Sequence, residues 1–426
     1  MELFWTIVFG VLFFALLMAS VALHEIGHLL PAKLFGVKVP QYFVGFGKTL
    51  WSTRRGETEY GIKLFPLGGF VRLLGMYPPA RHSARATWLQ RVADEARRYE
   101  WDDIRPADDG RLFYQKKVWQ RLIIMAGGIT MNLLIAFALL WGVYGLHGTY
   151  RAQPVVASIQ ACVITEARAD MTCQPSDPPS PAAQAGLQPA DRIVAFNGIA
   201  IESHEQLSRL IRGNLGGPVT LEVDRGGSRV TLPRVSTIVV GVPDTLDPSR
   251  VVEAGWLGVS PTIEKVYGGP ADVLADMGTM TAQSLVALAQ FPVKVWNVLA
   301  DLVTGAPRDI NGPIGIFGAS SIAGQAAVSD APVADKAAMF ASLLAAINLF
   351  LALFNLVPLP PLDGGHIVGA LWESVRRAAA KLTGRPDPGP VDTARMVPIA
   401  YAVGAFLLLC GLVLIVADIV SPMQIF

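Results

Sequence analysis

Three residues near the N-terminus combine the types and the spacing that bind a catalytic metal ion. His24-Glu25-Ile26-Gly27-His28 places two histidines four residues apart, with a glutamate beside the first. On a helix both imidazoles share one face and can hold one Zn2+ ion, while Glu25 can take a proton from a zinc-bound water. A chance match to so short a pattern is the alternative. It is disfavoured because ionisable groups at the end of an apolar run are costly unless something pairs with them.

A catalytic zinc ion also needs a third protein ligand and an open position for water. Leu34 stands where a soluble enzyme of this type would supply another histidine. We expect the third ligand to be Asp363, because the prolines and glycines around it can break a helix and aim its carboxylate inward. Two alternatives stay open: Asp363 could be an ordinary turn or capping residue, and His366 is a rival ligand.

The composition indicates that these residues belong to a membrane protein. Hydrophobic residues make up 52% of the 426 residues and charged residues 16%, whereas soluble domains carry roughly 25% charged residues. A helix needs about 20 apolar residues to cross a bilayer. Four uncharged runs reach that length: Leu3–Leu23, Leu122–Leu146, Ala337–Leu362 and Met396–Ala417. No basic block with interleaved aromatic residues suggests nucleic acid as a partner.

Basic residues that flank the spans predict their orientation. They follow the first span, precede the second and lie between the third and fourth, so these segments are expected to be cytoplasmic. Both termini and residues ~147–336 would then face outward. Met277–Val293 is expected to be an amphipathic or surface helix and Asn311–Ser329 a loop. A lone fifth span would put Asp363 on the opposite side from the histidines, whereas six spans would not.

Cys162 and Cys173 are expected to form a disulfide, because the predicted topology puts them outside the cytoplasm, where disulfides persist. Two free thiols are the alternative. Cys410 lies in the last span and should stay reduced.

These elements together resemble the site-2 protease family of intramembrane zinc metalloproteases, in its bacterial regulator-of-sigma-E-protease-like branch. The motifs are His24-Glu25-Ile26-Gly27-His28, Gly127-Gly128-Ile-Thr-Met-Asn132, Asn311-Gly-Pro-Ile-Gly315, and the run from Asn355 to Asp363-Gly-Gly365. The outer segment resembles a PDZ domain, and the alternating segment that ends at Gly68-Gly69 resembles the family's membrane-dipping β-loop.

The resemblance implies a polytopic α-helical membrane protein with four spans, a membrane-associated β-hairpin and an inserted extracytoplasmic α+β PDZ domain. The expected segments are the first span (1–35), the β-loop (36–75), a cytoplasmic helical segment (76–121), the second span (122–146), the PDZ domain (150–240), a connector with an amphipathic helix and the Gly-Pro-Ile-Gly loop (241–336), the third span (337–365), a cytoplasmic loop (366–395) and the fourth span (396–418).

The function implied is regulated intramembrane proteolysis at the bacterial inner membrane. Zn2+ would be held by His24, His28 and Asp363, with Glu25 as general base. Asn355, Gly68 and Gly69 would bind substrate, and an exposed strand edge could receive an extended substrate segment. The implied substrates are single-span membrane proteins, such as anti-sigma factors already trimmed outside, or remnant signal peptides. The PDZ domain would bind trimmed C-termini or act as a size filter. Rival functions are an inactive PDZ scaffold and a zinc transporter.

Overall fold

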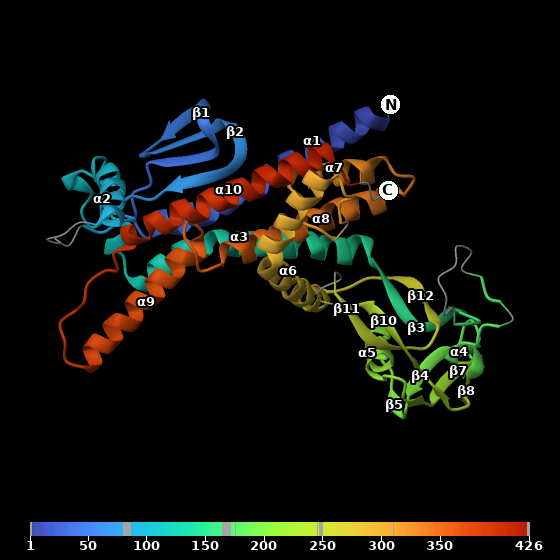
Figure 1. Ribbon diagram of the computed structural model, residues 1–426. Helices are drawn as coiled ribbons and strands as arrows, with labels where there is room; N and C mark the ends of the chain where they lie inside the picture. Colours follow the sequence, from blue (N-terminus) through green and yellow to red (C-terminus); the bar gives the residue numbers. More distant parts are fainter. Residues whose placement is uncertain are drawn as a thin grey trace. The chain divides into compact units, whose positions relative to one another are not determined.

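The computed structural model describes residues 2–79, 87–163, 172–174, 176–244, 246, 250–309 and 311–423. The chain forms two compact units (Figure 1). Unit 1 contains Met1–Val143 and Pro270–Phe426, and unit 2 contains Tyr144–Gly269. Unit 2 is therefore an insertion in the chain of unit 1.

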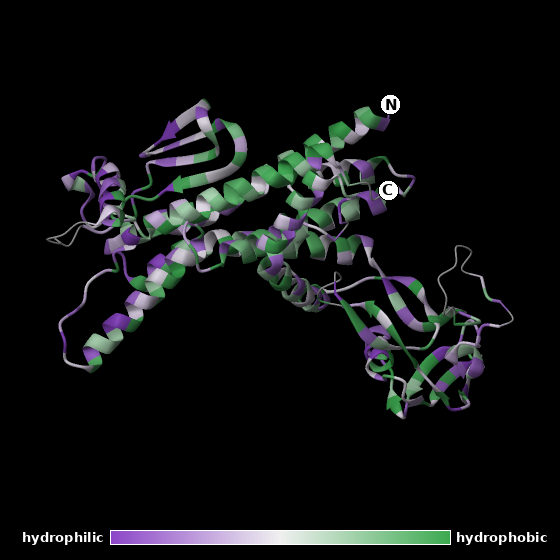
Figure 2. Ribbon diagram, viewed as in Figure 1, coloured by the Kyte–Doolittle hydropathy of each residue, from purple (hydrophilic) through white to green (hydrophobic). Residues whose placement is uncertain are grey.

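Unit 1 is built mainly from long helices, which Figure 2 shows as largely hydrophobic. They are α1 (Glu2–Leu34), α3 (Val118–Gly142), α6 (Pro270–Thr304), α7 (Ile316–Val328), α8 (Val333–Asn355), α9 (Asp363–Leu382) and α10 (Val397–Val420). Among the described residues, five helices are long and apolar enough to cross a membrane, judged by length and composition: α1, α3, α6, α8 and α10. The four expected spans are among these five, and the chain is an integral membrane protein.

Three segments differ from their expected form. Met277–Val293 belongs to α6, a helix of 35 residues that meets the criteria for a span. The stretch expected as a loop from Asn311 to Ser329 contains the helix α7. Its glycines lower helix propensity but let α7 pack directly on α1, where a Cβ at Gly324 would lie 2.2 Å from the Thr6 carbonyl oxygen. The loop expected at 366–395 is helical as far as Leu382.

A long antiparallel hairpin packs on α1. It consists of β1 (Gln41–Arg55) and β2 (Thr58–Arg72), and both strands bend. The start of β1, Gln41–Val44, pairs with Glu59–Ile62 on one side and with Gly69–Arg72 on the other. The outer part of the hairpin exposes large apolar side chains, including Phe46, Leu50, Trp51, Phe65 and Leu67. Its base is buried with α1 and α3 in a cluster that includes Leu29, Val39, Leu73 and Ile124.

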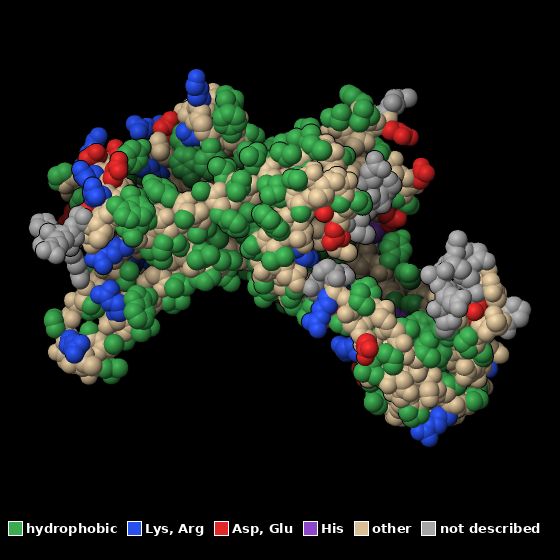
Figure 3. Space-filling model, viewed as in Figure 1, with side chains coloured by type: hydrophobic (Ala, Val, Ile, Leu, Met, Phe, Trp, Pro, Cys, Tyr) green, Lys and Arg blue, Asp and Glu red, His purple; other side chains and the backbone are tan. Residues whose placement is uncertain are grey.

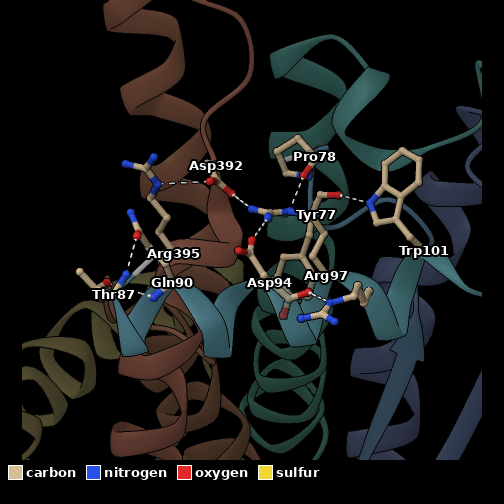
Figure 4. A network of polar contacts seen from close by, with 10 residues as sticks. Tyr77, Pro78, Thr87, Gln90, Asp94, Arg97, Trp101, Asp392 and Arg395 are labelled. Carbon is tan, nitrogen blue, oxygen red and sulfur yellow. Dashed lines mark hydrogen bonds and ion pairs between the residues drawn. The ribbon is translucent and has the colours of Figure 1, made fainter. Parts of the chain in front are cut away.

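A polar clamp follows the hairpin, in and around α2 (Trp88–Trp101), and Figure 4 shows it from close by. The Arg97 guanidinium donates to the Pro78 carbonyl oxygen at 2.9 Å through Nε and to Asp392 Oδ1 at 2.7 Å through Nη2. Glu100 accepts hydrogen bonds from the backbone N–H groups of Met76 and Tyr77. Side chains of α2 therefore tie the exit of β2 to the segment that enters α10.

Unit 2 is an α+β domain. Its strands are β3 (Thr149–Ile159), β4 (Arg192–Phe196), β5 (Ile199–Ala200), β6 (Pro218–Val219), β7 (Leu221–Arg225), β8 (Ser228–Thr231), β9 (Val235–Ser236), β10 (Ile238–Pro243), β11 (Val251–Trp256) and β12 (Val259–Val266), and its helices are α4 (Pro181–Gln184) and α5 (His204–Gly213). The main sheet has the order β12-β3-β4-β7-β8, with β5 on β4. Alternating residues of these strands, including Ile193, Leu221 and Val223, bury one apolar core together with Leu207 of α5.

An ion pair of a buried aspartate with a partly exposed arginine, and a disulfide, hold loops of unit 2. The Arg225 guanidinium donates a hydrogen bond to each carboxylate oxygen of Asp191, at 2.8 Å and 2.7 Å. The Arg225 guanidinium holds the pKa of Asp191 below its usual range. Cys162 and Cys173 are joined by a disulfide, and Cys410 is a free, buried thiol in α10.

Candidate metal centre

The first two candidate ligands lie on one face of α1, as their spacing requires. His24 and His28 are buried, and their Nε2 atoms lie 3.3 Å apart. The His28 Nδ1 atom is 2.8 Å from the Ile124 carbonyl oxygen of α3. A proton on Nδ1 would make this contact a hydrogen bond and leave Nε2 free for a metal, the usual arrangement of metal-binding histidines.

Asp363 joins the two histidines from a distant part of the chain. Its Oδ2 atom lies 3.2 Å from His28 Nε2 and 3.6 Å from His24 Nε2. It is the first residue of α9, after a tight turn that ends α8: a Cβ at Gly364 would lie 2.3 Å from the Val357 carbonyl oxygen. The expected break of the helix before Asp363 is therefore present.

These three residues fit a zinc ion. Among the described residues, their ligand atoms form the one group of three or more within 4.8 Å of one another. Asp363 Oδ2 and His24 Nδ1 are buried without a hydrogen-bond partner, so part of their polar capacity is unused. Two imidazoles and one carboxylate are a known donor set of catalytic zinc sites, which keep a fourth position open. His366 lies three residues further along α9 and does not belong to this group.

α1 and α3 cross at this site with almost no space between them. A Cβ at Gly127 would lie 2.0 Å from the Gly27 carbonyl oxygen, and one at Gly128 would lie 2.3 Å from His28 Nε2 and 2.6 Å from His24 Cε1. Only glycine therefore fits at positions 127 and 128. The sequence contains this glycine pair, but its role becomes visible only when the partner helix is known.

The hairpin reaches the same site. A Cβ at Gly69 would lie 3.0 Å from Glu25 Cγ. The Tyr42 hydroxyl donates to the Ala22 carbonyl oxygen of α1 at 2.8 Å. The end of β2 is therefore next to Glu25, and Gly68 is adjacent to it in that strand. Asn355 is the last residue of α8, and its amide makes no hydrogen bond within the described part of the chain.

Comparison with known proteins identifies the class of the molecule. Residues 12–385 match the family described as "Peptidase family M50". This match covers most of the chain, so the chain belongs to that family, as the resemblance of its motifs implied.

Three further comparisons concern individual proteins. The chain is 34% identical over 431 residues to "Zinc metalloprotease Rip1" of Mycobacterium tuberculosis (strain H37Rv), with 98% of each chain covered. It is equally similar to the protein of the same name from Mycolicibacterium smegmatis, again over 98% of both chains. A "Putative zinc metalloprotease" of Helicobacter pylori is 25% identical over 91% of this chain and 93% of its own. The chain is a zinc metalloprotease.

We predict that Gly128→Ala lowers zinc affinity, because the added methyl group would meet both imidazoles. Gly142→Ala in the same helix is the matched control, since a Cβ there meets nothing within 4 Å. Zinc bound per chain, measured against a series of chelator concentrations, should fall for Gly128→Ala and stay at the parent value for Gly142→Ala. Equal zinc affinity in both variants would contradict the steric argument.

Proposed function

We propose that the protein hydrolyses peptide bonds within transmembrane segments of single-span membrane proteins. The observation that carries this proposal is the cluster of His24, His28 and Asp363 beside Glu25, at the end of an otherwise apolar helix. A site for hydrolysis inside apolar helices is useful only for a substrate that is itself apolar. Among the described residues no further group of three candidate metal ligands occurs, which disfavours a zinc transporter.

We assign the chemical roles as follows. When bound, a zinc ion supplies Lewis-acid polarisation of a carbonyl and lowers the pKa of water. His24, His28 and Asp363 hold that ion. Glu25 takes the proton of the attacking water and passes it to the leaving amine. Glu25 is suited to this role because it neighbours His24 in sequence but is not a member of the ligand group. The Asn355 amide binds the substrate backbone or the developing oxyanion.

The substrate segment must be extended before it is cut, because the peptide bonds of a helix are already hydrogen-bonded. Gly69–Arg72 pairs with β1 along one side, and within the described residues no strand pairs with its other side. A substrate strand added at this edge would lie next to Glu25 and regain its backbone hydrogen bonds. Gly68 and Gly69 suit this role because they have no side chain to block the approach.

We propose four spans, with α6 bent rather than crossing. The first and last residues of unit 2 lie close together, because the Gly268 N–H donates to the Tyr144 carbonyl oxygen at 3.1 Å. The start of α6 therefore lies near the end of α3. The other half of α6 packs Val295 and Val298 against the last turns of α10. Because we expect α3 and α10 both to run outward, both ends of α6 lie on that side. Pro292 within α6 allows the bend.

Charges on unit 1 support the orientation. On the face seen in Figure 3, Lys and Arg gather over α2, the hairpin and α9, and hydrophobic side chains cover the long helices. By the positive-inside rule these charged parts are cytoplasmic. Both termini and unit 2 are then extracytoplasmic, where a disulfide between Cys162 and Cys173 persists.

We propose that unit 2 is a PDZ domain that selects substrates. Anti-sigma factors that another protease has already trimmed are the substrate class we favour, and remnant signal peptides are the alternative. A folded domain outside the membrane can refuse substrates with bulky outer parts or bind newly formed C-termini. It carries no candidate metal group among its described residues, so its role is selection rather than chemistry.

We predict that Glu25→Gln abolishes cleavage of a single-span substrate while zinc stays bound, because Glu25 is the base and not a ligand. Cleavage by the purified full-length protein in detergent and its zinc content are the two measurements. Comparing membrane fragments from cells that carry the parent or Glu25→Gln would identify natural substrates. Turnover near the parent rate would contradict the role of Glu25.

We predict that Asp363→Asn weakens zinc retention, since a neutral amide is a poorer ligand than a carboxylate. His366→Ala is the control and should retain zinc. Metal analysis after dialysis against a chelator decides between them. If His366→Ala loses the metal and Asp363→Asn does not, the third ligand is His366.

We predict that replacing Tyr144–Gly269 with a short Gly/Ser linker allows cleavage of untrimmed substrates. The hydrogen bond between the two ends of unit 2 makes this exchange feasible without stretching unit 1. Trimmed and untrimmed forms of one substrate are compared, with Glu25→Gln in the shortened chain as the blank. A shortened chain that only loses activity on trimmed substrate would indicate delivery instead of exclusion.

A further inference from the structure

α9 begins with Asp363 and buries few large apolar side chains that could hold the helix in place. Its buried residues are Gly364, Gly365, Gly369, Ala370 and Glu373. Ile367 is only partly buried, where it packs against the cluster at the base of the hairpin. The one long side chain buried on α9 is therefore a glutamate, and it lies ten residues after Asp363, or about 15 Å along the helix axis.

Glu373 is fully buried and uses both carboxylate oxygens. Arg121 of α3, whose side chain is 6% exposed, lies 2.5 Å from Oε1 through Nη2. Arg377 lies 3.1 Å from the same oxygen, and the Val391 N–H donates to Oε2 at 3.0 Å. Loss of these partners would leave a buried charge unpaired and strongly destabilise the fold, so the middle of α9 can take few other positions.

The same face of α3 touches the metal centre. Arg121, Ile124 and Gly128 follow one another at intervals of three and four residues, which puts them on one side of the helix. Ile124 contacts His28 through its carbonyl oxygen, and Gly128 lies against His24 and His28. α3 thus contacts the histidines of α1 through Ile124 and Gly128, and it contacts α9 one turn earlier through Arg121.

The chain after α9 strengthens this connection. Three consecutive residues of the segment before α10 each contact a different part of unit 1. Val391 donates to Glu373 of α9, and Asp392 accepts from Arg97 of α2. Thr393 donates to the Met76 carbonyl oxygen, after β2, at 2.7 Å. Glu373 is therefore bound to both α3 and a segment that is itself fixed.

We propose that Glu373 and Arg121 are positioning residues that set the distance between Asp363 and the two histidines. The inference deepens the proposed function, because it requires Asp363 to be a zinc ligand. The helix transmits the position: a tilt of α9 where Glu373 meets Arg121 moves its first residue. The competing explanation is that the tight turn at Gly364 alone fixes Asp363 and that the ion pair only stabilises the fold.

The chain contains a matched control pair far from the metal centre in sequence. Arg308 and Asp418 have side chains 5% and 1% exposed, and Arg308 Nη1 lies 2.9 Å from Asp418 Oδ1. Asp418 also accepts a backbone hydrogen bond, from Gly318 at 2.7 Å. Both pairs thus join one buried carboxylate to one buried arginine and one backbone N–H, and Glu373 has the partly exposed Arg377 in addition. The control pair joins α10 to the segment before α7, and neither carries a candidate ligand.

The experiment measures zinc affinity of the full-length protein in detergent, by competition with a chelator, for Arg121→Met, Glu373→Gln, Arg308→Met and Asp418→Asn. We expect the first two to lose about 10-fold in affinity, the lower end of the loss seen when a residue that touches a metal ligand is replaced, because Glu373 and Arg121 act on Asp363 only through α9. The control variants should keep the parent affinity, although their melting temperatures fall as well. Cobalt in place of zinc should show a changed visible spectrum only in the first two variants.

Arg121→Lys covers the case in which Arg121→Met does not fold, because it keeps the charge and loses the planar fork of arginine. An intermediate affinity is expected. The proposal is overturned if folded Arg121→Lys and Glu373→Gln bind zinc as tightly as the parent, or if the control pair weakens zinc equally. Asp363→Asn is measured in parallel. If that variant keeps full affinity, the ligand assignment fails, whereas a loss there without a loss at Glu373 refutes only the positioning role.

Discussion

The close crossing of α1 and α3 is the constraint on which the metal centre depends. The two backbones meet where Gly27 faces Gly127. At the next residue of α3, Gly128, the imidazoles of His24 and His28 leave no room for a side chain. This contact fixes the rotation of α1, and the rotation decides where both imidazoles point. The carbonyl oxygen of Ile124 then orients the His28 ring. One packing contact between small residues therefore determines the direction of two ligands.

The sequence predicted the parts of this structure that depend on local pattern. Spacing alone put His24 and His28 on one helical face, and alternation with a central glycine predicted the hairpin that ends near Gly69. Bringing Asp363 to the histidines required more than local pattern. That inference depended on the helix-breaking residues before it and on counting which side of the membrane each run reaches. The structure brings these three residues together.

Tertiary contacts explain what the sequence could not predict. α7 is helical despite its glycines and serines because they allow close contact with α1, a gain that helix propensity does not include. α6 extends far beyond the uncharged run Met277–Val293, since the charged residues Asp276 and Lys294 end that run but not the helix. Glu373 resembles any charged residue of an amphipathic segment. Only the fold reveals that it is buried against Arg121.

The two ways of holding helices in unit 1 follow from the environment that each helix meets. Between helices surrounded by lipid, water supplies no hydrophobic driving force, so close packing of small residues and buried polar contacts must hold them together. α1, α3 and α7 use small residues, as at Gly10, Gly27 and Gly324. α9 leaves this bundle, and the ion pair of Glu373 with Arg121 can fix its middle at a defined point. Breaking a buried ion pair leaves an uncompensated charge, so this contact resists displacement of the helix. A helix whose first residue must meet two imidazoles, at 3.2 Å and 3.6 Å, is the one for which such a fixed point matters most.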